Sequence, residues 1–162
     1  MEYKNIKDPQ YPYASEPTVA YGNRVWSLVL GDKDLKEALP SEATLIALTR
    51  TGIAKSSLKH LAYVLGVTME ELSAYLHSSY RNIQRKKEDE ILDVTKTEKV
   101  LELTTFAQKG IDVFGSRNAF AQWIHSPLIA LNGQEPRQLL DTTFGITLLS
   151  DMLGRIEHGI FS

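Results

Sequence analysis

The chain has 162 residues and a formal net charge of −2, and its 43% hydrophobic and 23% charged content is typical of one globular domain or two small ones. This charge balance excludes a uniformly basic nucleic-acid-binding surface, so contact with nucleic acid requires a local basic patch. The absence of cysteine excludes disulfides and thiolate zinc sites, no secretory signal is expected, and no apolar run approaches the roughly 20 residues of a membrane span.

The first 22 residues alternate prolines with tyrosines, a pattern that opposes regular structure. We predict a flexible N-terminal arm over residues 1–22. The arm either stays mobile or packs on a partner subunit through its tyrosines, and the composition favours the first alternative.

Helical periodicity dominates after residue 22, and convincing strand alternation is absent, so the predicted fold class is all-α. One helix is expected between Ser41, as N-cap, and Gly52. The next ends at Gly66 and places four apolar residues on one face, namely Leu58, Leu61, Ala62 and Leu65. A third helix opens with a capping box formed by Thr68 and Glu71.

A longer helix is expected to start at Thr95, in a capping box with Glu98, and to end at Gly115. A short helix capped by Ser116 follows, and then a loop that ends where Pro136 occupies the first position of the next helix. The last helix directs five apolar residues inward: Ile146, Leu149, Met152, Leu153 and Ile156.

A basic run over residues 81–87 is followed at once by Glu88, Asp89 and Glu90. This change from basic to acidic residues indicates a domain boundary, which we place near residue 94. The predicted units are a helix-turn-helix DNA-binding and dimerisation domain over 23–94 and a second helical domain over 95–162.

Two registers compete for the helix-turn-helix. In "LAYVLGVTMEEL" the turn residue is Gly66, but the second helix presents two glutamates, which phosphates repel. In "LSAYLHSSYRNIQRKK" the turn residue is His77, which must then adopt a backbone conformation that often needs positive φ. We choose the second register, because arginine pairs with guanine edges, asparagine and glutamine with adenine, and lysine with phosphates.

The expected DNA face in that register consists of Ser79, Tyr80, Arg81, Asn82, Gln84, Arg85, Lys86 and Lys87. The alternative is that the basic run is only a solvated helix surface, balanced by the acidic run beside it.

The last third contains "VFG", "AFAQWI", "SPLIALNGQEPRQLLDT", "FG" and "LGRIEHG" in that order. Over roughly residues 98–162 it resembles the toxin-binding domain of the Xre/MbcA/ParS-like antitoxins of RES-type toxin–antitoxin systems. The segment upstream resembles that family's Xre-type helix-turn-helix and favours the second register.

The resemblance implies a cytoplasmic antitoxin that forms a homodimer or higher assembly and binds operator double-stranded DNA. It also implies a cognate RES-domain toxin that degrades NAD or uses it for ADP-ribosylation, and whose active site the antitoxin's C-terminal segment blocks. No enzyme activity, cofactor or membrane contact is expected of the chain itself.

The predicted toxin-binding residues are Arg155, Glu157, His158, Gly159, Ile160, Phe161 and Ser162. Apolar residues at the end of a polar segment are suited to burial in another protein, with Phe161 as the anchor. Alternatively the terminal pair folds back onto its own core, and the chain is a stand-alone regulator whose C-terminal domain dimerises or senses a ligand.

The sequence departs from the family pattern at His77, where glycine is common, and at Asn82, where threonine is common. Gly110 also interrupts a helix that otherwise propagates well, at a cost of about 1 kcal/mol relative to alanine. The four histidines, His60, His77, His125 and His158, lack the spacing of metal ligands on a helix, so no metal site is expected.

Overall fold

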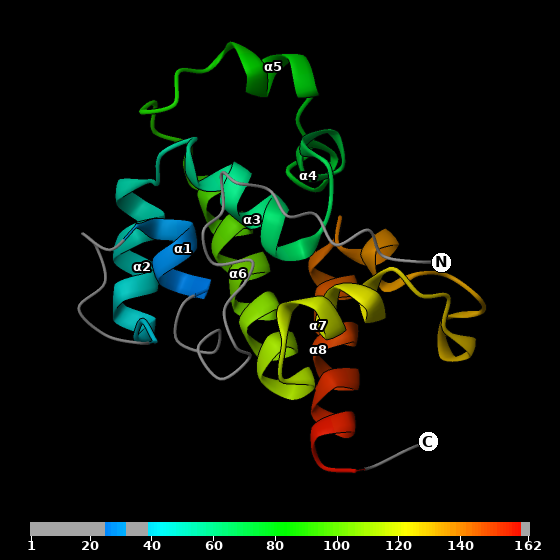
Figure 1. Cartoon of the computed structure of the whole chain (residues 1–162). Helices are drawn as coiled ribbons and strands as arrows, with labels where there is room; N and C mark the ends of the chain where they lie inside the picture. The colour runs from blue at the N-terminus through cyan, green and yellow to red at the C-terminus, as the bar shows by residue number, and fades with distance from the viewer. Residues whose placement is uncertain (1–24, 32–38, 160–162) are drawn as a thin grey trace.

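The computed structural model describes residues 25–31 and 39–159 (Figure 1). Over these ranges the secondary structure is helical, with a single isolated antiparallel bridge between Ala54 and Ile91 and no strand. The predicted all-α fold is therefore confirmed. The predicted N-terminal arm, residues 1–22, lies outside the described residues.

The α-helices are α1 (Val25–Leu30), α2 (Glu42–Thr51), α3 (Ser57–Leu65), α4 (Met69–Tyr75), α5 (Tyr80–Arg85), α6 (Val94–Phe114), α7 (Arg117–Ile124) and α8 (Thr143–Glu157). Two 3₁₀ helices, η3 (Ile129–Leu131) and η4 (Pro136–Leu139), lie between α7 and α8. None of these described helices combines the length and apolar character needed to cross a membrane.

Most predicted helix ends are confirmed. Ser41 and Ser116 each accept a backbone N–H three residues on, and Thr68 forms its capping box with Glu71. Gly66 and Gly115 end α3 and α6 in the left-handed conformation. Local hydrogen bonding thus decides where these helices begin and end.

The predicted start of α6 is wrong. Asp93 is the N-cap: its carboxylate accepts the N–H of Lys96 at 2.8 Å and pairs with the Lys96 ammonium at 2.7 Å. A carboxylate at this position satisfies the free N–H group and also interacts favourably with the helix dipole, so it displaces the hydroxyl of Thr95. Pro136, by contrast, opens η4 at the expected first position.

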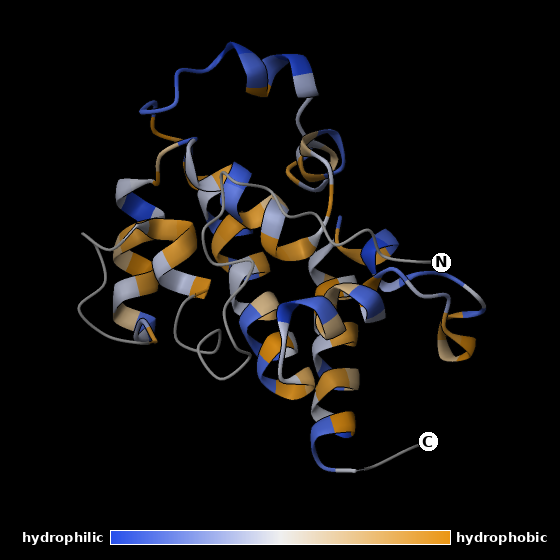
Figure 2. Ribbon diagram, viewed as in Figure 1, coloured by the Kyte–Doolittle hydropathy of each residue, from blue (hydrophilic) through white to orange (hydrophobic). Residues whose placement is uncertain are grey.

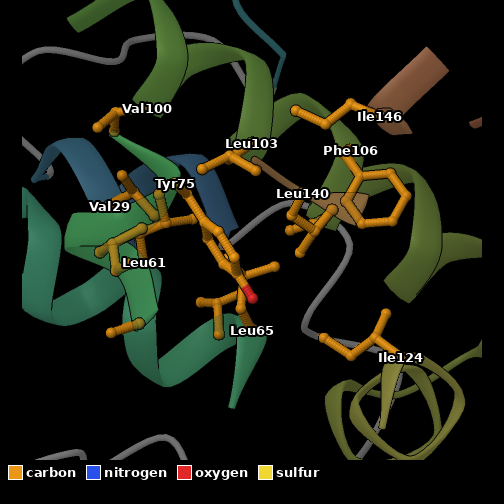
Figure 3. Packing of buried hydrophobic residues seen from close by; sticks show 14 of the residues in the cluster. Val29, Leu61, Leu65, Tyr75, Val100, Leu103, Phe106, Ile124, Leu140 and Ile146 are labelled. Atoms are coloured by element: carbon orange, nitrogen blue, oxygen red, sulfur yellow. The ribbon is translucent and has the colours of Figure 1, made fainter. Parts of the chain in front are cut away.

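α6 runs through the centre of the molecule and packs against α1, α2, α3, α7 and α8 (Figure 1). One continuous hydrophobic cluster surrounds it, and hydrophobic residues recur along the ribbons of these helices (Figure 2). Figure 3 shows residues from both sides of position 94 meeting in this cluster, among them Leu61, Tyr75, Leu103 and Ile146. The division into 23–94 and 95–162 stays a prediction about sequence units, which share one core.

Gly110 is explained by close packing. A β-carbon at this position would lie 2.2 Å from the ring of Phe120. That ring is fully buried and makes an edge contact with Phe106, with 5.6 Å between ring centroids. The glycine therefore lets α7 approach α6 at the aromatic centre of the core.

On α8, three of the five predicted inward-facing residues, Ile146, Leu149 and Leu153, are buried. The other two, Met152 and Ile156, are half-buried. The buried residues share one helix face, which is the face that packs along α6.

Candidate functional site

The turn between α4 and α5 has the backbone that the second register requires. His77 has a φ of 54°, one of two positive φ values at described residues other than glycine. Its ring donates a hydrogen bond from Nε2 to the carbonyl oxygen of Asp141 at 2.8 Å, which stabilises a conformation that costs histidine more than glycine. Gly66, between α3 and α4, is also left-handed, with a φ of 67°. Backbone geometry fits both registers, so the choice still rests on charge and stays a prediction.

The expected DNA face lies on and just after α5. Arg81, Asn82, Gln84, Arg85 and Lys87 are exposed, whereas Ile83 is fully buried and anchors the helix. The helix forms one end of the molecule (Figure 1), and most of its residues are hydrophilic (Figure 2).

Three of the predicted DNA-face residues have other surroundings. The hydroxyl of Ser79 caps α5 by accepting the N–H of Asn82 at 3.1 Å, so its first role is structural. Tyr80 is half-buried, and Lys86 is half-buried at the C-cap. A serine just before a helix suits both an N-cap and a phosphate contact, so the sequence alone does not separate the two roles.

Sequence reasoning missed Lys55, which holds the end of α5 in place. Its ammonium group donates to the carbonyl of Lys86 at 2.7 Å and to that of Gln84 at 3.4 Å, and it lies 3.5 Å from the carboxylate of Glu88. A cation at a helix C-terminus satisfies free carbonyl groups and complements the dipole. No local pattern signals this contact, because Lys55 lies 31 residues before Lys86.

The α4–turn–α5 unit is also tied to the segment before α8. The guanidinium of Arg137 pairs with the carboxylates of Glu71 and Glu135. The buried Tyr75 hydroxyl donates to the Arg137 carbonyl at 2.8 Å. Burial, assisted by the nearby carboxylate of Glu71, raises the pKa of Tyr75, so this hydroxyl keeps its proton and remains a donor.

A second tie joins α3 to α7. Arg117 donates to the carbonyl of Tyr63 from Nε at 3.0 Å and from Nη2 at 2.5 Å, and its guanidinium lies 4.2 Å from the centre of the Tyr63 ring. Charge-assisted bonds and ring stacking together fix this planar group. These contacts therefore fix the orientation of α3 relative to α7.

The expected toxin-binding segment begins in the last turn of α8. Arg155, Glu157, His158 and Gly159 are exposed. Gly159 has a φ of 70° and donates its N–H to the Ile156 carbonyl at 3.1 Å, just after α8 ends at Glu157. Ile160, Phe161 and Ser162 lie outside the described residues. This end of α8 lies at the opposite end of the molecule from α5 (Figure 1).

Metal ligands do not gather anywhere in the part of the chain that the structure describes. Over residues 25–31 and 39–159 no three histidine, aspartate or glutamate side chains lie close enough to hold an ion. The exposed residues of these ranges include the basic side chains of α5 at one end and the charged side chains Arg155 and Glu157 at the other.

Two family models match the chain side by side. Residues 44–104 match the antitoxin Xre-like helix-turn-helix domain. Residues 109–159 match the antitoxin Xre/MbcA/ParS C-terminal toxin-binding domain. The first match ends and the second begins within α6, and the second one includes α7, η3, η4 and α8.

Three curated relatives of the chain are also named antitoxins. A protein named "Antitoxin Xre" from Yersinia enterocolitica is 29% identical over 80 residues, which cover 49% of this chain and 54% of the relative. Another "Antitoxin Xre", from Photorhabdus laumondii, is 31% identical over 68 residues, covering 41% and 46%. The "Prs ADP-ribosylating antitoxin" of a Sphingobium species is 27% identical over 127 residues, covering 72% and 80%. The chain thus spans about half the length of the two Xre relatives that it matches.

Proposed function

The chain belongs to the Xre/MbcA/ParS antitoxins, and we propose that it neutralises a cognate RES-domain toxin that acts on NAD and represses its own operon by binding operator DNA. The observation that carries the proposal is the placement of two exposed, chemically different surfaces at opposite ends of one core (Figure 1). In this arrangement one chain contacts DNA and toxin without steric conflict.

The DNA half of the proposal rests on α5. Its exposed Arg81, Asn82, Gln84 and Arg85 carry the donor and acceptor groups that pair with base edges in the major groove. Lys86 and Lys87 at its end supply contacts to phosphates. Lys55 and the buried Ile83 hold the helix in place from the other side, so the reading groups are presented on a fixed support.

The toxin half rests on the end of α8. Gly159 adopts the left-handed conformation just after the last turn of α8, where it ends the helix. We propose that a plug formed by Ile160, Phe161 and Ser162 enters the toxin's active site, with Arg155, Glu157 and His158 contacting the rim of that site. The relatives are named antitoxins, which supports an inhibitory role for the chain and not a catalytic one.

The test is co-purification with the product of the neighbouring reading frame. Three forms are compared: the full chain, a chain ending at His158, which keeps α8 whole, and a chain ending at Gly154, which removes its last turn. We expect the full chain to co-elute with the toxin and to stop its turnover of NAD, and both shortened forms to fail to stop it.

Circular dichroism and binding to a duplex from upstream of the gene serve as controls, since both shortened forms keep the core and α5. Unchanged inhibition by the chain ending at His158 would refute the plug. No co-elution of the full chain, with DNA binding intact, would favour a stand-alone regulator.

A further inference from the structure

One face of α8 points away from the core and is partly apolar. Phe144 is 90% exposed and Leu148 is 45% exposed. Asp151 and Arg155 are also exposed, and the spacing of four, three and four residues places all four side chains on one side of the helix. We call these four residues the α8 outer stripe.

The rotation of α8 forces the stripe outward. A β-carbon on Gly145 would lie 2.0 Å from the carbonyl oxygen of Leu139, so only glycine allows the helix to approach η4 this closely. Ile146, Leu149 and Leu153 occupy the opposite face and are buried. With that face fixed against α6, Phe144 has no route into the core of its own chain.

We propose that the α8 outer stripe docks on the toxin, beside the opening of its active site. This inference rests on the proposed function and deepens it. The stripe lies wholly within the residues that match a toxin-binding domain. It ends at Arg155, the first of the proposed toxin-binding residues, so the stripe adjoins the described part of that segment.

The geometry defines what the toxin must offer. Phe144 precedes Arg155 by eleven residues, or roughly 16 Å along the helix. The toxin therefore presents an apolar hollow within about that distance of its active-site opening. A large aromatic side chain that fills a well-packed pocket, surrounded by contacts that exclude water, is a usual arrangement of an interface hot spot. The stripe supplies affinity, and the plug supplies inhibition.

The experiment measures binding and inhibition separately, with the purified toxin from the neighbouring reading frame. The test variant is Phe144→Ala combined with Leu148→Ala, and Leu148→Gln alone is the second variant should the double variant not fold. Ile46→Ala is the matched control, because Ile46 is a 52% exposed aliphatic residue on α2, outside the toxin-binding match.

We expect the dissociation constant for the toxin to rise at least tenfold in the double variant, severalfold in Leu148→Gln, and to change less than twofold in Ile46→Ala. At saturating concentration the double variant still stops NAD turnover, whereas the chain ending at His158 binds without stopping it.

Three results would overturn the inference. Wild-type affinity in both stripe variants would refute it and leave the proposed function intact. Absence of binding by the unmodified chain would refute the proposed function, and the inference with it. A changed oligomeric state of the double variant alone, with unchanged toxin affinity, would assign the stripe to self-association.

Discussion

Gly145→Ala tests how tightly α8 is seated on η4. Gly145 is the third residue of α8 and is buried, and a β-carbon there would lie 2.0 Å from the Leu139 carbonyl oxygen and 2.9 Å from its carbon. An ordinary carbon–oxygen contact is about 3.3 Å, so the helix must move by about 1.3 Å. The obstacle is backbone, which no rotamer change relieves.

The change in the free energy of unfolding of Gly145→Ala is the sum of opposing effects. Overpacking against a rigid neighbour costs about 3 kcal/mol at the upper end of its range. The movement also loosens the bond from the Gly145 N–H to the Thr142 hydroxyl, 2.9 Å long, and the bond of His77 to Asp141. Replacing glycine with alanine in a helix by itself stabilises the helix by about 1 kcal/mol. We expect a net loss of about 2–3 kcal/mol in the free energy of unfolding, and a fall of roughly 5–10 °C in Tm.

Gly154→Ala is the control, because it makes the same change on the same helix. A β-carbon there would meet only the Lys109 ammonium, at an ordinary 3.5 Å. This variant should gain about 0.5–1 kcal/mol. Urea unfolding followed by circular dichroism measures both. If both variants are stabilised, the close approach of α8 to η4 is not the reason for Gly145.

Three further predictions concern other parts of the molecule. Arg117→Lys should lower the free energy of unfolding by about 1–2 kcal/mol in urea titrations, because an ammonium group cannot make both bonds to the carbonyl and stack on the ring. Arg81→Ala with Arg85→Ala should weaken binding to the upstream duplex and reduce the slope of log K against log salt by about 0.9 for each phosphate that these arginines neutralise, with Arg50→Ala on α2 as control. An unchanged slope would contradict the chosen register. Burial, followed by the charge of the adjacent lysine, holds the pKa of His60 below its ordinary 6.5, so the unfolded chain takes up the proton first as the pH falls. The free energy of unfolding should therefore decrease as the pH drops from 6.5 through the lowered pKa. A His60→Gln variant whose urea midpoints fall in the same way would disprove this assignment.

Much of the fold was predictable because helices are specified locally. The capping residues Ser41, Thr68 and Ser116 act on N–H groups three residues away, so a short stretch of sequence contains both partners. The one wrong cap, Thr95, shows the limit of this reasoning, since two capping residues stood within one turn and the carboxylate of Asp93 prevailed.

The surface of α5 was predictable for the same reason. A helix with a single buried anchor, Ile83, exposes most of its remaining side chains, and their charges are already visible in the sequence. The roles within that set were not predictable. Whether a serine caps a helix or faces DNA depends on where the helix begins, to the residue.

The sequence by itself determined the all-α class, most helix ends and the positive φ of His77. Only the tertiary structure decided how the helices rotate and meet. It brought Lys55 to the end of α5, 31 residues away, and His77 to Asp141, 64 residues away. It also turned Phe144 outward by seating Gly145 on Leu139. These contacts depend on how all the helices pack around α6 at once, and a pairing between distant residues leaves no periodic trace in the chain.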